Sequence, residues 1–335
     1  FGAVAAVYAW DILGSCLAAI LSRALLVPLS KYVDDLFAVS WTNGAKELRE
    51  YLLRVIELLG FTLEEEKTPY PASEATILGV HLRLSEFRRR NMKYREVNVT
   101  IDPEKAPHWL SQVERALHCG FLSTEDAQKL SGRLNFIAGA ILGPVGACKI
   151  RALYQIACTG GGYISRAARE ELQWWKEYLH EQRPACVRVY PLLDQVPILY
   201  TDAEGEGGIG GVLVTGEKMF WYRSRVFPEE TIGLRERRTQ IIPFEAIAAY
   251  RCIKKFRSAI SNREAVIFID NLSVKGALRK GRCRKDDIQA IIERSLQLLE
   301  SHRIRLYPVW VPSALNISDL PSRGIKIPRG KEVSE

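Results

Sequence analysis

The tetrapeptide Tyr32-Val33-Asp34-Asp35 constrains the fold of the N-terminal part of this chain, because it lies between two apolar runs, 25–29 and 36–39. This pattern predicts a strand, a tight turn that carries two adjacent acids, and a returning strand. Two carboxylates at a hairpin tip are poor candidates for a core and good ligands for a hard divalent cation. An isolated turn of this kind is more often solvated than catalytic, so other acids must support a metal site.

A second set of acids lies far downstream. Three of its members end a predicted strand or follow one, and Glu245 lies in the first turn of a helix predicted over 243–256. The set is Asp202, Glu245, Asp270 and Asp319. Each acid alone is more often a cap or turn residue. Together, four converging carboxylates are able to hold two Mg²⁺ ions roughly 4 Å apart, and Mn²⁺ is an alternative.

The charge of the chain indicates a polyanionic partner for its last third. The formal net charge is +8, and residues 196–327 hold 22 Lys and Arg against 15 Asp and Glu. The excess positive charge is therefore concentrated in that segment. Six of the basic residues fall within eleven positions, in a segment that is either a phosphate grip or a solvated helix face: Lys275, Arg279, Lys280, Arg282, Arg284 and Lys285.

The seven cysteines have no CxxC spacing, and their number is odd. This pattern argues against a disulfide framework and favours a reducing, intracellular location, cytoplasmic or nuclear. No zinc-ligand set is visible. The apolar stretch that ends at Leu29 is interrupted by Asp11 and Arg23. We interpret it as a buried helix of a longer protein, and we expect no membrane partner.

The order of the predicted elements indicates an α/β multi-domain protein. We expect strands at 61–63, 76–84, 198–200, 209–214, 219–223, 265–269 and 304–311. We expect helices at 3–24, 46–59, 103–119, 123–142, 145–158, 165–181 and 243–256, and further helices up to residue 301. Ser123 is a candidate helix cap. The expected domains are 1–85, 86–160, 161–195, 196–327 and a tail, 328–335.

With these motifs in place, the chain resembles the C-terminal part of a retroelement reverse transcriptase. Tyr32–Asp35 looks like the metal-binding turn of the polymerase palm, and 196–327 looks like a ribonuclease H domain. The ending Val311-Pro312-Ser313-Ala314-Leu315-Asn316, followed by Asp319-Leu320-Pro321-Ser322-Arg323, is similar to hepadnavirus-type and tyrosine-recombinase retroelement enzymes. The resemblance covers nearly the whole chain.

The resemblance implies a role for individual residues. Asp34 and Asp35 match the palm acids, with Asp34 the stronger ligand, and Lys67 matches a lysine suspected of protonating the leaving pyrophosphate. Gly79 falls in a segment that looks like the primer grip, and Phe1-Gly2 resembles the start of a template-contacting motif. Residues 86–160 take the place of a thumb and 161–195 that of a connection. Asp202, Glu245, Asp270 and Asp319 fall on the metal-binding acids of ribonuclease H.

Two departures from the family pattern are visible. Polymerases of this type need another palm aspartate, upstream of the motif that begins at Phe1, and fingers. Asp11 cannot replace that aspartate, so we expect no polymerase activity from this chain alone. Many ribonucleases H also place a histidine in the loop before the last acid, where this chain has Ser313-Ala314. This departure bears on product release and turnover.

Several residues retain two interpretations. Arg88, Arg89 and Arg90 contact template or primer, or form an exposed loop. Asn271 and Asn316 orient the substrate or cap local turns, and Ser322-Arg323 is structural or contacts phosphate. Trp174-Trp175 favours packing over base stacking, since adjacent helix residues face different ways.

The leading hypothesis is two-metal cleavage of the RNA strand in RNA–DNA hybrids, with hybrid and template/primer as partners. The alternative is a non-catalytic nucleic-acid-binding scaffold from a domesticated or decayed retroelement. The intact acids argue against this alternative, whereas the truncated palm argues for it. A third hypothesis is another nuclease of the same fold, such as a resolvase or transposase, which the Tyr32–Asp35 turn disfavours.

Overall fold

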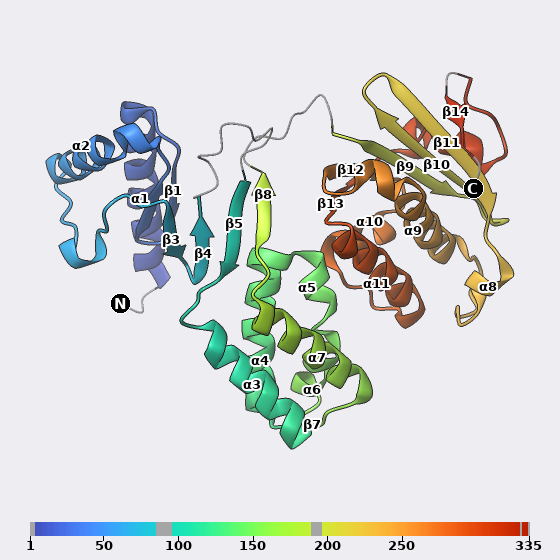
Figure 1. The fold of residues 1–335 in the computed structure, drawn as a ribbon, viewed down its shortest axis with the longest axis horizontal. Coiled ribbons are helices and arrows are strands. Elements are labelled where there is room, and N and C mark those ends of the chain that lie inside the picture. The colour runs from blue at the N-terminus through green and yellow to red at the C-terminus, as the bar shows by residue number, and fades with distance from the viewer. Residues whose placement is uncertain (1–3, 85–95, 189–195, 329, 334–335) are drawn as a thin grey trace. The chain divides into compact units, whose positions relative to one another are not determined.

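The fold was analysed in a computed structural model that describes residues 4–84, 96–188, 196–328 and 330–333. The chain divides into two compact units, Phe1–Ser73 and Glu74–Glu335. Helices and several β-sheets occur together, as Figure 1 shows, so the expected α/β multi-domain class is confirmed. The predicted domain boundaries remain predictions.

The N-terminal unit is built from two helices and one hairpin. Its elements are α1 (Val4–Leu25), β1 (Leu29–Tyr32), β2 (Asp35–Ala38), η1 (Thr42–Gly44), α2 (Ala45–Leu58) and η2 (Glu65–Lys67). The expected acidic hairpin is present, because β1 and β2 are antiparallel and Tyr32 pairs with Asp35 across the turn. Trp10 Nε1 of α1 donates to Val33 O at 3.0 Å and so ties the turn to the helix.

Helix α1 is largely exposed in this unit, so the expectation of a buried helix was wrong. Leu17 and Leu21 are buried and pack against Ile56 of α2, but most of the other apolar side chains of α1 lie in solvent. The most exposed are Val7, Tyr8, Ile12 and Leu13. The small partner layer of α2 and one hairpin cannot cover a 22-residue apolar helix. Among the described residues, Ala5–Leu25 is the one segment long and apolar enough to cross a membrane.

The second unit begins with a four-stranded antiparallel sheet and a helical body. The strands, in sheet order, are β3 (Glu74–Ile77), β4 (Val80–Arg83), β5 (Glu96–Ile101) and β8 (Ala185–Arg188). The helices are α3 (Ala106–Cys119), α4 (Thr124–Ile137), the π-helical turn η4 (Ala138–Leu142), α5 (Pro144–Cys148), α6 (Arg151–Cys158) and α7 (Arg166–Glu181). Two short strands, β6 (Phe121–Leu122) and β7 (Gly162–Tyr163), pair with each other.

Helix periodicity explains the core of this body. On α3, Ala106, Trp109, Val113 and Ala116 are buried on one face, the spacing of an amphipathic helix. Ser123 caps α4 as predicted, since its side chain accepts a hydrogen bond from the Asp126 N–H. Trp175 of α7 is fully buried, and its Nε1 donates to Lys149 O at 2.8 Å, which confirms the packing interpretation.

Three predicted elements differ from the structure. The segment predicted as one strand over 76–84 is the hairpin β3–β4, whose turn holds Leu78 and Gly79 at φ values of 51° and 79°. Glycine adopts this left-handed backbone without the steric cost of a Cβ, and periodicity alone does not reveal such a turn. The helix predicted over 145–158 is divided into α5 and α6, and residues 61–63 form no strand.

The C-terminal part of the second unit is a six-stranded mixed sheet with helices packed on it. Its strands are β9 (Ile198–Ala203), β10 (Gly208–Thr215), β11 (Lys218–Arg225), β12 (Glu264–Ile269), β13 (Arg305–Trp310) and β14 (Lys331–Glu332). Its helical elements are α8 (Pro228–Thr231), α9 (Ile241–Ile260), α10 (Leu272–Lys280), α11 (Asp286–Ser301), η6 (Ser313–Leu315) and α12 (Asp319–Ser322). The strand order in this sheet is β13-β12-β9-β10-β11-β14. We call the sheet and its helices the α/β body.

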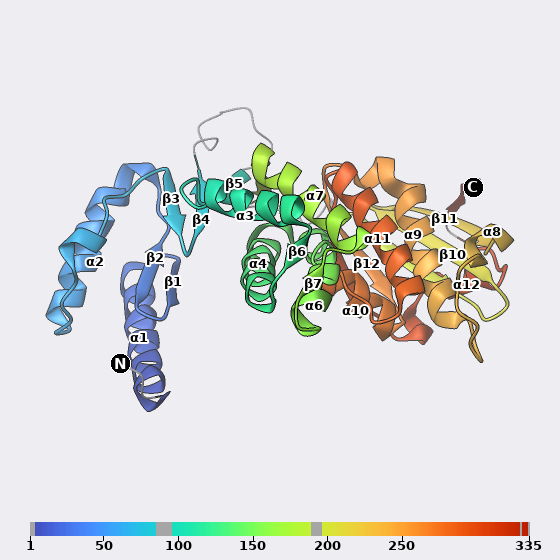
Figure 2. The same cartoon turned by 90° about the horizontal axis from the view of Figure 1, so that it is seen from below.

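Alternation along the strands builds the core of the α/β body. In β12, Ala265, Ile267 and Ile269 are buried, and they share one apolar cluster with residues of α9 and α11. Figure 2 shows α9 and α11 side by side, and Figure 1 shows them below β9 and β12. Burial of each isoleucine side chain contributes about 1.5–3 kcal/mol, so this shared cluster holds α9 and α11 on the sheet.

Candidate functional site

The strand register of the α/β body brings two predicted acids together. Strands β9 and β12 are parallel neighbours, and Ile269 pairs with Thr201. The next residue on each strand is an acid, Asp202 on β9 and Asp270 after β12. Because adjacent parallel strands end at the same edge of a sheet, the two carboxylates reach the same place.

Helix α9 supplies the third acid. Glu245 lies in the second turn of α9, which packs on β9, and it accepts a hydrogen bond from the Ala203 N–H. One carboxylate oxygen each from Asp202, Glu245 and Asp270 lie within 4.8 Å of one another. These three are the one group of its kind among the described residues. Three of the four acids predicted for this site therefore converge.

Burial and mutual repulsion define the electrostatics of this cluster. Burial first, and then the charges of Asp202 and Asp270, raise the pKa of Glu245 to about 9. Burial also raises the pKa of Asp202 to about 6, against the opposing hydrogen bond from Ser322 and with added repulsion from Asp270 and Asp319. Without a cation, the raised pKa keeps Glu245 protonated near neutral pH, whereas a bound cation would favour its charged form and offset the repulsion from Asp202 and Asp270.

The cluster fits a divalent cation. Two of its oxygens, Glu245 Oε2 and Asp270 Oδ1, are buried and have no hydrogen-bond partner among the described residues. A buried carboxylate oxygen without a partner is costly, and so such atoms need an explanation. Hard oxygen ligands that converge within a few ångströms are the donors that Mg²⁺ and Mn²⁺ prefer. The donor set therefore matches the predicted cofactor class.

Asp319 lies beside this cluster rather than within it. Its Oδ1 accepts a hydrogen bond from Arg323 Nε at 2.9 Å, and its side chain is 33% exposed. Its charge still contributes to the raised pKa of Asp202, so the two carboxylates interact electrostatically. Asp319 is thus positioned as an outer member of the site.

Residues after β13 hold the acids in place. Ser322 Oγ donates to Asp202 Oδ2, and Ser313 Oγ donates to Asp270 Oδ2 at 2.8 Å. The buried Asn316 donates through Nδ2 to Thr201 O at 3.0 Å, so it fixes this segment to the end of β9. These contacts agree with the structural interpretation of Ser322, and Asn316 Oδ1 accepts from the Ser318 N–H at 3.3 Å, as its turn-capping interpretation predicts.

Sequence reasoning missed the roles of Ser313 and of Trp310, whose Nε1 donates to Asp270 O at 3.1 Å. Ser313 was noted only as the residue in the place of a histidine. The one sequence signal for these roles was that Trp310 and Ser313 lie shortly before Asp319 in the chain. The partners of these side chains lie 40 or more positions away, and only the pairing of β12 with β13 brings them together.

The predicted acids of the N-terminal unit, Asp34 and Asp35, are exposed. Asp34 lies in the hairpin turn and Asp35 begins β2. Lys67 lies in the same unit, but its Nζ pairs with Glu64 Oε2 at 2.7 Å. This hydrogen bond and the Glu64 charge raise the pKa of Lys67. The remaining acid of α1, Asp11, pairs with Lys31 at 2.6 Å.

Of the remaining residues predicted to contact template or primer, the structure describes Gly79. Gly79 lies in the β3–β4 turn, where an added Cβ would lie 3.4 Å from Lys105 Nζ and 3.6 Å from Phe136. Phe1-Gly2 and Arg88, Arg89 and Arg90 lie outside the described residues.

The basic segment Lys275–Lys285 runs from α10 to the start of α11. Its side chains are exposed at Arg279, Lys280, Arg282, Arg284 and Lys285, and half-buried at Lys275. The Cζ atom of Arg282 lies 5.6 Å from the centre of the Tyr154 ring, and its Nη2 donates to Asn135 Oδ1 at 3.4 Å. This side chain therefore also contacts the helical body. Asn271, next to Asp270, caps α10 by accepting from the N–H groups of Ser273 and Val274.

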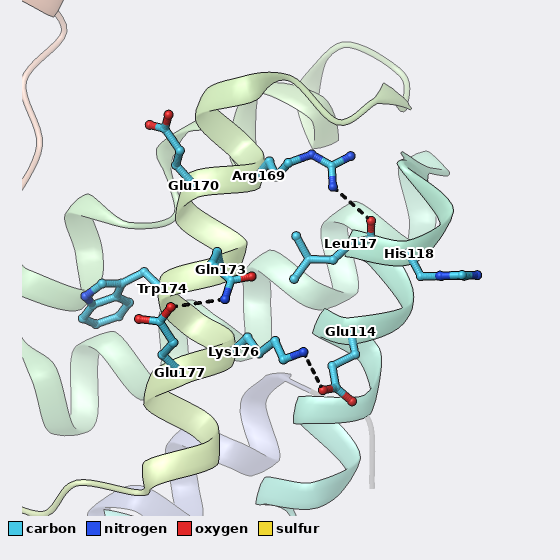
Figure 3. A pocket seen from close by; sticks show the side chains of 9 residues that line it. All are labelled: Glu114, Leu117, His118, Arg169, Glu170, Gln173, Trp174, Lys176 and Glu177. Carbon is cyan, nitrogen blue, oxygen red and sulfur yellow. Dashed lines mark hydrogen bonds and ion pairs between the residues drawn. The ribbon is translucent and has the colours of Figure 1, made fainter.

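A separate cleft of about 660 Å³ lies between α3 and α7 (Figure 3). Three of its polar side chains, Lys176, Gln173 and Arg169, bind local partners. Lys176 Nζ lies 3.0 Å from Glu114, Gln173 donates to Glu177 at 3.2 Å, and Arg169 donates to Leu117 O at 3.2 Å. This cleft contributes no residue to the acidic cluster.

Comparisons with known proteins give structural neighbours only. No protein-family model matches the chain, and no curated protein does. A foamy viral protease–reverse transcriptase in complex with RNA/DNA hybrid is 13% identical with a TM-score of 0.43, over 96% of this chain and 40% of that one. A second foamy viral structure, in complex with double-stranded DNA, is 13% identical with a TM-score of 0.41, over 88% and 48%. RNase H1 from Halobacterium salinarum NRC-1 is 16% identical with a TM-score of 0.27, over 36% and 89%. The chain thus spans less than half the length of these two foamy viral proteins.

Proposed function

We propose that the α/β body is a divalent-metal-dependent nuclease that cleaves the RNA strand of RNA–DNA hybrids. The observation that carries this proposal is the convergence of Asp202, Glu245 and Asp270, with two buried oxygens that lack a partner among the described residues. The order of these acids along the chain supports it, because it matches the ribonuclease H pattern noted in the sequence.

The residues of the chain have distinct roles in this proposal. Asp202, Glu245 and Asp270 would hold two Mg²⁺ ions, with Asp319 as an outer ligand, and Mn²⁺ would serve as a substitute. When bound, such ions supply an activated water and stabilise charge on the phosphate. The exposed basic side chains of Lys275–Lys285 would bind the nucleic-acid backbone without reading its sequence. Only the RNA strand carries 2′-hydroxyls, which provide the basis for choosing it.

We also propose that the whole chain is part of an intracellular retroelement reverse transcriptase. The support is the order of an acidic hairpin, a helical body and an acid-bearing α/β body along one chain. Asp34, Asp35 and Lys67 would belong to the polymerase site, and Gly79 with Arg88, Arg89 and Arg90 would contact template or primer. A further palm aspartate is missing from this chain, so we expect no DNA synthesis by the chain alone.

The test is cleavage of an end-labelled RNA–DNA hybrid with Mg²⁺, beside single-stranded RNA and duplex DNA. Asp270→Asn should abolish cutting and retain binding, because it removes one charge from the cluster with little change in shape. Asp126→Asn, at an exposed acid of α4, is the matched control and should cut as the parent does. Binding without cutting in every variant, with either metal, would contradict the proposal and favour the non-catalytic scaffold.

A further inference from the structure

The two carboxylate oxygens of Asp270 have different surroundings. Oδ2 accepts a hydrogen bond from Ser313 Oγ at 2.8 Å, whereas Oδ1 is buried and has no partner among the described residues. The backbone of Asp270 is held as well, because Trp310 Nε1 donates to its carbonyl oxygen at 3.1 Å. The last residue of β13, Trp310, therefore restrains the main chain of this acid, and Ser313, just after β13, restrains its side chain.

The Ser313 contact limits how the carboxylate of Asp270 is able to rotate. A carboxylate exchanges its two oxygens by rotation about the Cβ–Cγ bond, and a hydrogen bond to one oxygen disfavours that rotation. Since Ser313 binds Oδ2, Oδ1 is the oxygen left for an ion shared with Asp202 and Glu245. Groups that orient metal ligands in this way typically change metal affinity or activity by about 10- to 100-fold.

We propose that Ser313 is a positioning residue that orients Asp270 and thereby sets the affinity of the acidic cluster for a divalent cation. This inference rests on the metal centre of the proposed function, and it assigns a role to a residue that does not itself bind the ion. Ser313 is exposed, so removal of its hydroxyl leaves no cavity in the core.

The experiment measures ion binding directly, without substrate. Purified full-length chain is titrated with Mn²⁺, and free Mn²⁺ is followed by its electron paramagnetic resonance signal. All variants carry Asp34→Asn and Asp35→Asn, so that the exposed hairpin acids bind no ion. Ser313→Ala should weaken Mn²⁺ binding by about 10- to 100-fold.

Two controls separate orientation from general damage. Ser313→Thr keeps the hydroxyl and should bind Mn²⁺ within about twofold of the parent, well below the effect of losing an orienting group. Ser301→Ala removes a hydroxyl that donates to Leu298 O at the end of α11, and it should also have no effect on binding. Cleavage assays on the same proteins should show that the Mg²⁺ concentration for half-maximal rate rises only in Ser313→Ala.

Equal Mn²⁺ affinity in Ser313→Ala and the parent would overturn the inference. A parent that binds no Mn²⁺ would overturn it too. A parent that binds Mn²⁺, loses that binding in Ser313→Ala, and yet cuts no hybrid would refute the proposed nuclease while supporting the role of Ser313. The two proposals therefore fail in distinguishable ways.

Discussion

The hydroxyl of Ser322 donates a hydrogen bond to Asp202 although the two residues lie 120 positions apart in the chain. Both side chains are buried, Asp202 at the end of β9 and Ser322 in α12. This bond favours the charged form of Asp202 and so opposes the effect of burial on its pKa. The last helical turn of the α/β body is thus coupled to its first strand at the acidic cluster.

Replacement of Ser322 by alanine should reduce hybrid cleavage by about 10- to 100-fold, because Asp202 loses a group that orients it. The measurement is the single-turnover cleavage rate at saturating Mg²⁺. Ser131→Ala is the matched control, since Ser131 is equally buried and its hydroxyl donates to Gln128 O within α4. Similar losses of stability in the two variants, with a loss of cleavage only in Ser322→Ala, are the expected result. Unchanged cleavage in Ser322→Ala would contradict the role of this bond.

Substitution of Gly210 by alanine should displace the segment that carries Ser322. A Cβ at position 210 would lie 2.3 Å from Ser318 O and 2.6 Å from Ser322 N, closer than packing allows. Overpacking of this kind costs about 1–3 kcal/mol of stability. A shift of about 1 Å at a reacting group costs about 100-fold in rate. Thermal unfolding and hybrid cleavage are the two measurements.

Gly205 provides the comparison for this variant. It lies between β9 and β10, where an added Cβ would meet nothing within 4 Å. Gly205→Ala should therefore keep both stability and cleavage. Loss of cleavage in both variants would show that the close approach at Gly210 is not the cause.

Neutralisation of Arg279 and Lys280 should weaken hybrid binding and flatten its dependence on salt. Each lost phosphate contact lowers the slope of log K against log salt by about 1, so the double change to Gln should lower it by about 2. Binding is measured in the Asp270→Asn background, in which the hybrid stays intact. Lys129→Gln with Arg166→Gln is the control, since both residues are exposed and pair with acids of their own helices. An unchanged slope for the Arg279 and Lys280 variant would favour a solvated helix face.

The stability of the helical body should depend on Glu171 between pH 4.5 and 6. Burial raises the pKa of Glu171 from 4.5 to about 6, although its carboxylate accepts hydrogen bonds from the N–H groups of Ala152 and Leu153. The folded state therefore binds more protons than the unfolded state in this range. The contribution of Glu171 to stability is fully present below pH 4.5 and falls by about 2 kcal/mol as pH rises through 6.

Glu171→Gln removes this titration and keeps an acceptor for α6. The free energy of unfolding from urea titrations, parent minus variant, should decline by about 2 kcal/mol between pH 4 and pH 7. A difference that stays constant over this range would show that Glu171 titrates normally.

The sequence by itself determined the elements whose signals are local. The acidic hairpin at Asp34 and Asp35, the capped helix after Ser123 and the alternating strand β12 follow from turn chemistry, capping and periodicity over short windows. The order of the four acids, three at or just after predicted strands and Glu245 near the start of a predicted helix, also indicated one site. Local patterns failed at the β3–β4 turn, where Leu78 and Gly79 adopt a left-handed backbone, and at α1, whose burial depends on how much partner surface its unit supplies.

Only the tertiary structure decided which side chains meet. The parallel register of β9 with β12 places Asp202 beside Asp270, and α9 brings Glu245 to both, whereas Asp319 pairs with Arg323 at the side. Ser313 and Ser322 acquire their roles from bonds across 43 and 120 positions of chain. Propensity and spacing act over a few residues, while these contacts depend on strand order and on packing of the whole core, and for that reason no local pattern contained them.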